Sequence, residues 1–262
     1  GLPASAQEKF VISSTPGTIH KNLIIMPLRL SEGVGAAPGD VMAFNVITGE
    51  LTWSFHTLPR PGETGIDTWG DLNISESTLV GAANNWAGMS LDQEREILYV
   101  PTGSAAPDFY GAMRPGKNLY SNCLLALNAN TGKLLWHYQF IHHDLWDRDP
   151  PAPPNLITVN HGGIIIPAVA QITKQGYVFV FDRETGRPLF DIEELAVPES
   201  ELPGEQAWPT QPVPVKPACF ARQSDKLTTE DISPYAPNRD SLIAIFKKAD
   251  IRNFAPPSLK PA

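Results

Sequence analysis

The chain has 262 residues, a length that fits one large domain or two small ones. Its hydrophobic share of 42% is enough to bury a sizeable core, which excludes wholesale disorder. The net charge of −8 argues against nucleic acid or an anionic membrane as the main partner, because both recruit basic patches. The 20 glycines and 26 prolines exceed the average share of roughly 12% and favour many short strands joined by turns over a helical bundle.

The first predicted elements are a strand and a hairpin. Leu23–Leu28 is an apolar run that fits an inner strand. Val41–Trp53 reads as a strand, a turn with Asn at its entry and Thr-Gly at its exit, and a second strand that ends on Trp53. The Asn side chain can bond backbone amides across the turn, and Gly tolerates the positive φ that closes it. Residues 58–85 then read as a long loop.

The same pattern returns twice along the chain. After the strand Ile97–Pro101 and a second long loop at 104–120, Leu124–Trp136 repeats the hairpin with its terminal tryptophan. The run Gly163–Ile172 precedes a third copy, Val178–Phe190, which ends on phenylalanine. Three unrelated hairpins could share turn residues, but the shared aromatic ending favours a true repeat. Each hairpin is therefore interpreted as the outer half of a four-stranded propeller blade.

The chain changes character after the third hairpin, and residues 190–262 read as irregular. Val197–Pro217 is rich in proline and acid and is predicted to cross the surface in extended form. Thr229–Asp231 is expected to form a short turn, and Asp240 is expected to cap a helix over Ser241–Lys248. The fold class is thus all-β, and residues 1–262 are expected to form about four blades of one longer propeller domain, because four blades do not close a ring of the usual size.

The repeat ending, Thr-Gly-Lys/Glu-x-x-Trp, resembles the tryptophan-docking motif of the pyrroloquinoline-quinone (PQQ) dehydrogenases. Two further stretches, His142–Asp149 and Ala170–Asp182, resemble the active-site segments of the membrane glucose dehydrogenase branch of that family. This resemblance implies an eight-bladed β-propeller, of which the chain would cover the middle part.

The resemblance also implies roles for three side chains. Asp147 matches the carboxylate that accepts the hydroxyl proton, Lys174 matches the lysine that bonds the quinone oxygens, and Trp86 matches the floor on which the flat cofactor stacks. Without the resemblance, the alternative interpretation is that Asp147 is a solvated loop carboxylate, Lys174 an exposed turn lysine and Trp86 a core tryptophan. The neighbouring Asp144 and Asp149 are expected to be solvated loop carboxylates.

A calcium site is implied less completely. Glu32, in a Ser-Glu-Gly-Val-Gly stretch, resembles the calcium-binding glutamate of the alcohol-oxidising relatives, and Asp147 is expected to add an oxygen. Those relatives use an asparagine near the position of Ser104, and the glucose branch uses an Asp-Asn pair where Glu32 and Gly33 stand here. The sequence therefore departs from both ligand sets.

Two other features carry no expected chemistry. His142 and His143 are adjacent and point to opposite faces of an extended segment, so structural hydrogen bonding is expected rather than metal chelation. The glycosylation sequon at 73–75 is expected to have no role. A dinucleotide fingerprint is absent from the sequence, which argues against nicotinamide cofactors.

The resemblance implies PQQ- and Ca²⁺-dependent oxidation of a sugar or polyol hydroxyl. Asp147 would take the proton, hydride would pass to the quinone, and electrons would leave to a membrane quinone or a cytochrome in the periplasm. One alternative is a non-catalytic propeller of the same repeat that serves as a scaffold for protein partners. Another is a family member whose present chain is inert without the remaining blades.

Overall fold

The structure is a computed structural model that describes residues 10–72 and 79–259. Two antiparallel four-stranded sheets form its N-terminal half. The first contains, in spatial order, β2 (Thr18–His20), β3 (Leu23–Met26), β5 (Val41–Asn45) and β6 (Leu51–Phe55). The second contains β8 (Ser90–Asp92), β9 (Ile97–Pro101), β11 (Cys123–Asn128) and β12 (Leu134–Gln139). Both sheets match the expected blades.

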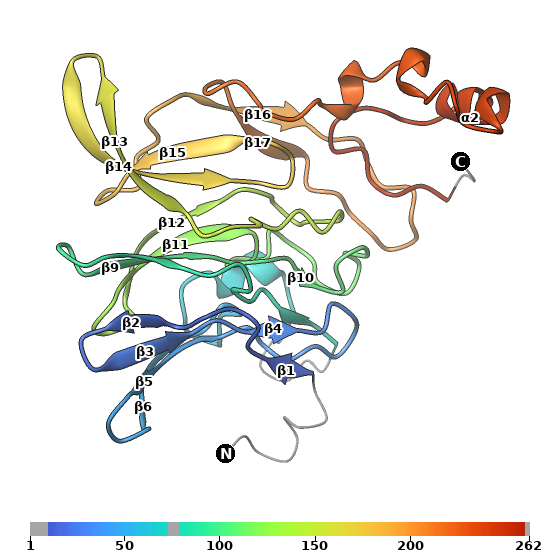
Figure 1. The fold of residues 1–262 in the computed structure, drawn as a ribbon. Helices are drawn as coiled ribbons and strands as arrows, with labels where there is room; N and C mark the ends of the chain where they lie inside the picture. Colours follow the sequence, from blue (N-terminus) through green and yellow to red (C-terminus); the bar gives the residue numbers. More distant parts are fainter. Residues whose placement is uncertain (1–9, 73–78, 260–262) are drawn as a thin grey trace.

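Smaller sheets complete the described β-structure. The third blade has three strands, β13 (Asn155–His161), β14 (Ile164–Ile172) and β15 (Val178–Asp182). Two-stranded pairs are formed by β16 (Ile192–Ala196) with β17 (Thr210–Pro214), β1 (Val11–Ile12) with β4 (Arg29–Leu30), and β7 (Gly81–Ala82) with β10 (Ala105–Ala106). Figure 1 shows the three blades stacked in chain order, as in a propeller sector.

The third hairpin forms only in part. Its turn closes as predicted, but the segment after Gly186 makes a single bridge, between Phe181 and Pro188, instead of a strand. Two backbone bonds flank this bridge, from the Asp182 N–H to the Arg187 carbonyl and from the Leu189 N–H to the Val180 carbonyl, both at 2.9 Å, but the pairing does not continue into a strand. The hairpin prediction is therefore wrong for its second strand.

Two other predictions change in the C-terminal part. The predicted surface crossing contains β17, which pairs with β16 in a hairpin. The short turn forms as the 3-10 helix η3 (Thr229–Asp231), and another, η2, spans Ser224–Lys226. Helix α2 (Arg239–Phe246) begins earlier than expected, with Asn238 at its N-cap, so Asp240 lies in its first turn and does not cap it. A carboxylate there still complements the positive end of the helix dipole.

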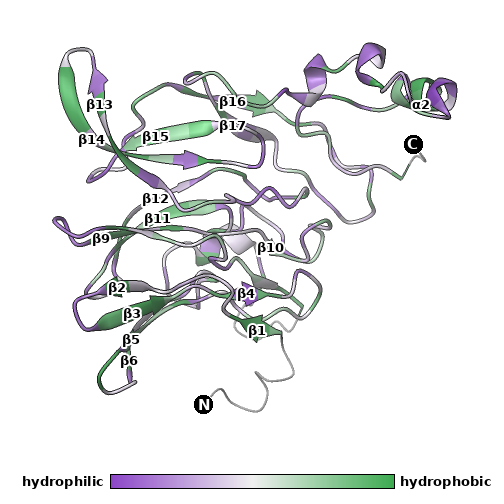
Figure 2. Cartoon of the chain, in the orientation of Figure 1, coloured by the Kyte–Doolittle hydropathy of each residue, from purple (hydrophilic) through white to green (hydrophobic). Residues whose placement is uncertain are grey.

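The core is continuous across the second sheet because both faces of that sheet are covered. On β11, Leu125 and Leu127 pack into the cluster shared with the first blade, while Leu124 and Ala126 pack into the cluster shared with the third. Strand side chains alternate between faces, so a strand buried on both sides reads as an uninterrupted apolar run. Figure 2 shows this hydrophobic strand within the stack and more hydrophilic turns at its margin.

The tryptophans join each blade to the next. The Trp53 indole N–H donates to the Ala129 carbonyl at 3.2 Å, and that of Trp136 donates to the Arg183 carbonyl at 3.0 Å. A Cβ at Gly132 would overlap with the Trp53 indole, so the turn glycine lets the ring lie against the backbone. The predicted docking role of the two tryptophans is confirmed.

Two remaining observations concern features outside these sheets. No helix in the described ranges is long and apolar enough to cross a membrane. The sequon at 73–75 lies outside the described residues.

Candidate functional site

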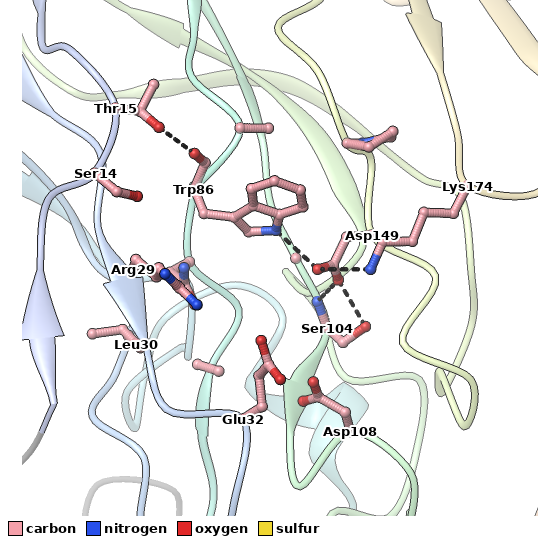
Figure 3. Close-up of a pocket in the computed structure, with 15 residues that line it drawn as sticks. Ser14, Thr15, Arg29, Leu30, Glu32, Trp86, Ser104, Asp108, Asp149 and Lys174 are labelled. Atoms are coloured by element: carbon pink, nitrogen blue, oxygen red, sulfur yellow. Dashed lines mark hydrogen bonds and ion pairs between the residues drawn. The ribbon is translucent and has the colours of Figure 1, made fainter.

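A cavity of about 510 Å³ opens where the loops between the strands converge. Its lining comes from six separated parts of the chain, and Figure 3 shows the polar side chains that face it. The lining includes the polar and aromatic side chains of Arg29, Glu32, Trp86, Ser104, Asp108, Asp149 and Lys174. The long loops at 58–85 and 104–120 thus end at or pass along this cavity, as their length suggested.

Trp86 is fixed at its backbone and at its ring. Its carbonyl accepts from the Thr15 hydroxyl at 2.6 Å, and its indole N–H donates to Asp149 Oδ2 at 2.9 Å. The preceding Asn85 amide anchors the loop by donating to the Pro101 carbonyl at 2.6 Å. The ammonium of Lys174 lies 5.8 Å from the indole centroid. Arg29 lines the same cavity, and in the view of Figure 3 it is drawn on the other side of the indole from Lys174.

Lys174 connects the two carboxylates of the Trp-Asp-Arg-Asp segment. Its Nζ lies 2.9 Å from Asp147 Oδ1 and 3.5 Å from Asp149 Oδ2. Burial raises the pKa of Asp147, and the hydrogen bond from Lys174 lowers it. Burial is the larger effect, so the pKa is about 6. Burial alone would lower the pKa of Lys174, but the charges of Asp149 and Asp147 outweigh this effect and raise it. Lys174 is therefore held charged beside a carboxylate that accepts protons near neutral pH.

Asp144 and Asp149 are buried, so the expectation that they are solvated is wrong. Their exposed fractions are 1% and 8%. Asp149 Oδ1 accepts from the backbone N–H of Ser104 at 2.6 Å and from its hydroxyl at 2.9 Å. Asp144 accepts from the Asn122 amide at 2.7 Å and from the Arg148 N–H at 2.6 Å. These bonds replace hydration and tie the segment that carries Asp147 to the cavity wall.

The acidic end of the cavity contains Glu32 and Asp108, whose carboxyl groups face each other in Figure 3. Asp108 is 4% exposed, and its Oδ1 has no hydrogen-bond partner among the described residues. Burial, with the nearby charges of Asp149 and Asp147, raises the pKa of Asp108 to about 8. A divalent cation bound at Glu32 would lower the negative charge at this end of the cavity, and carboxylate oxygens are the ligands that a hard cation such as Ca²⁺ prefers.

The protein groups alone do not complete a metal site. Within the described ranges, no three His, Cys, Asp or Glu side chains are grouped so that they could hold a metal ion. Asp147 is not among the residues that line the cavity with Glu32, and its Oδ1 is bound by Lys174. A calcium ion here would need further oxygens from a ligand or from water.

The two histidines have the structural roles expected for them. His142 Nδ1 lies 2.8 Å from the Gln139 side-chain oxygen, and His143 Nδ1 lies 2.7 Å from the Gly116 carbonyl. Burial and the charge of Arg114 lower the pKa of His143 to about 4, so its ring is neutral at pH 7.

Sequence reasoning did not find three of the cavity residues. Arg29 lies on the two-stranded pair β1–β4, Asp108 follows β10, and Asp149 was read as solvated. The one available signal was the length of the loop at 104–120, which marked the region of Asp108 but not the residue.

Comparison with known proteins gives a consistent result. The family model for the PQQ glucose/ethanol/alcohol dehydrogenase β-propeller domain matches residues 1–262. The chain is 35% identical over 205 residues to the quinoprotein glucose dehydrogenase of Gluconobacter oxydans, covering 76% of the chain and 25% of that protein. It is 37% identical over 223 residues to the quinate/shikimate dehydrogenase (quinone) of Acinetobacter baylyi, covering 83% and 27%.

A solved structure agrees with these relatives. The quinohemoprotein alcohol dehydrogenase from Comamonas testosteroni superposes with a TM-score of 0.62 at 25% identity, over 79% of the chain and 32% of that structure. The chain spans about a quarter of the length of the glucose and quinate dehydrogenases it matches. With a match along its whole length, the chain belongs to the PQQ-dependent glucose/ethanol/alcohol dehydrogenase β-propeller family.

Proposed function

We propose that this chain provides the cofactor floor and the proton acceptor of a PQQ-dependent dehydrogenase that oxidises a hydroxyl group of a sugar or polyol. The observation that carries the proposal is the contact network around Lys174. This side chain lies beside the Trp86 ring, and it binds Asp147 and lies near Asp149. The three residues singled out from the sequence thus converge through a single ammonium group. A scaffold protein has no need for such an arrangement.

The cavity suits PQQ, a flat tricyclic quinone with three carboxylates. Trp86 offers an aromatic surface of matching shape, and Arg29 and Lys174, which line the same cavity, offer positive charge. PQQ supplies, when bound, an acceptor for the two electrons of the oxidation. Lys174 would hold the quinone oxygens, and the hydrogen bond from Trp86 to Asp149 would keep the indole in a fixed orientation.

Asp147 would take the proton from the substrate hydroxyl. A general base works best when its pKa lies near the working pH, and the pKa of Asp147 is raised to about 6. The ammonium of Lys174, 2.9 Å from Oδ1, fixes the carboxylate in position. Asp147 also has a positive φ of 55°, a conformation that the hydrogen bonds of its neighbours maintain.

For the metal we propose Ca²⁺ at Glu32, with an oxygen from Asp147. The acidic end of the cavity supports the choice of a hard cation. We place the enzyme in the periplasm and its electron acceptor among respiratory quinones and cytochromes. The relatives named for glucose and for quinate/shikimate support a polyhydroxylated substrate, and the second of these is named as quinone-linked.

The proposal is tested by titrating the protein with PQQ in the presence of Ca²⁺ while following tryptophan fluorescence. Saturable quenching is expected in the wild type. Lys174→Ala should weaken PQQ binding by about ten-fold or more, because a charge-assisted hydrogen bond is lost. Asp147→Asn should bind PQQ with similar affinity but lose about 10²- to 10⁴-fold in turnover.

The matched control is Lys133→Ala, which removes a lysine in the exposed turn between β11 and β12. It should leave both quenching and turnover unchanged. If the wild-type protein that carries this chain with all its blades shows no saturable PQQ binding, the enzyme proposal is wrong and the scaffold alternative takes its place.

A further inference from the structure

The Asp108 carboxyl group is buried in the cavity wall without a protein partner for one of its oxygens. Its Oδ1 has no hydrogen bond among the described residues, although the residue is only 4% exposed. An uncompensated buried carboxyl destabilises a fold, and such groups are retained where a ligand supplies the missing bond.

The neighbouring arginine does not supply it. Arg114 is fully buried, and its guanidinium donates twice to the carbonyl of Pro107, at 3.0 and 3.2 Å, and once each to the carbonyls of Asp108, at 3.2 Å, and Asp144. A further N–H donates to the Asn118 side chain at 3.0 Å. All five of its described hydrogen bonds therefore hold the main chain or Asn118, and none reaches the Asp108 carboxylate. The result is a rigid backbone that holds an unpaired carboxyl group in the cavity.

Asp108 shares a wall with the proposed reaction centre. It lies four residues after Ser104, beyond β10, and Ser104 donates twice to Asp149, which lies 3.5 Å from the Lys174 ammonium. Both Asp108 and Lys174 line the same cavity. A substrate with its reacting hydroxyl at Asp147, beside Lys174, would extend into the cavity that Lys174 lines, where a second hydroxyl could bond Asp108.

We propose that Asp108 is a specificity residue that hydrogen-bonds a second hydroxyl of a polyhydroxylated substrate. This inference rests on the proposed dehydrogenase function and names the chemical feature that the site selects. A carboxyl oxygen in a dry wall favours a ligand that carries a hydroxyl there and rejects one that carries a methyl group, because the methyl group leaves the oxygen unpaired. Asp108 does not form a three-carboxylate metal set with Glu32 and Asp149, since no such group exists in the described ranges.

The test compares glycerol with 1-propanol, two three-carbon substrates that differ in their hydroxyls, on the PQQ-loaded protein. In Asp108→Leu, the KM for glycerol should rise about ten-fold or more, while the KM for 1-propanol changes less than about two-fold. Asp108→Asn, which keeps a hydrogen-bonding group of the same size, should restore most of the preference for glycerol. The control is Asp191→Leu, which removes one negative charge from an exposed position outside the cavity.

Three results would overturn the inference. An unchanged glycerol preference in Asp108→Leu would show that the carboxyl group binds only water. Equal losses on both substrates, together with weaker Tb³⁺ luminescence binding, would assign Asp108 to the metal. Absence of PQQ quenching in the wild type would overturn the dehydrogenase function and this inference with it, whereas normal quenching with an unchanged preference removes only the role of Asp108.

Discussion

The two buried aspartates of the cavity wall differ in how their charge is balanced. Asp149 accepts hydrogen bonds from Trp86 and Ser104 and lies near Lys174, whereas Asp108 has an oxygen without a partner. Motif matching could single out Trp86, Asp147 and Lys174 as candidates, because their local sequence resembles the family, and the structure brings the three together. It could not predict the burial of Asp149, since the partner Ser104 is 45 residues away and only the fold brings them together.

We expect Asp108→Asn to stabilise the protein, and to do so more at higher pH. The pKa of Asp108 is about 8 in the folded state against an ordinary value of 3.8, so the folded state resists ionisation. The resulting penalty is absent below pH 3.8 and grows up to about pH 8. The variant should gain on the order of 3 kcal/mol at pH 8 and much less at pH 5. Urea unfolding in EDTA at the two pH values measures this, and equal gains at both would contradict it.

At the scale of elements, the repeated hairpin is the feature that the sequence predicts best. Asn45, Asn128 and Asp182 each accept backbone N–H bonds from the residues two and three positions later, which closes the three turns in the same way. These contacts are local, so a sequence pattern contains them. The segment after Gly186 shows the limit of this reasoning, because the repeat implied a strand there and the structure forms only one bridge.

The two turn glycines allow the docking contact to be measured separately from backbone strain. Gly49 has φ 74° with nothing within 4 Å of an added Cβ, while Gly132 has φ 70° and lies against the Trp53 indole. Gly49→Ala should cost about 1 kcal/mol of unfolding free energy, from the left-handed backbone alone. Gly132→Ala should cost about 2–4 kcal/mol, because it also displaces the ring. Chemical denaturation compares them, and equal losses would mean that the docking contact contributes nothing.

At the scale of the molecule, the middle sheet couples the blades on either side of it. Leu125 belongs to the cluster shared with the first blade, and Leu124 to the cluster shared with the third. Both are fully buried and lie on the same strand, β11. Adjacent residues that face different clusters make the two interfaces parts of one folding unit.

Leu124→Ala and Leu125→Ala should therefore shift the same unfolding transition. Each removes a buried side chain and should cost about 2–5 kcal/mol. Differential scanning calorimetry should show one endotherm that moves to lower temperature in both variants. Two endotherms, each responding to only one variant, would show that the blades unfold independently.

The tryptophan contact also determines where the chain can be divided. Trp53 belongs to the first blade by sequence, but its ring lies against Gly132 and its N–H reaches Ala129 in the second. A segment cut just after β6 would therefore leave this indole exposed to water, although it would contain every strand of its sheet. The sequence repeat ends at the last strand of a blade, but the smallest unit that buries its own tryptophan also includes the turn of the next blade. A shortened protein that contains the first blade should therefore end beyond Gly132.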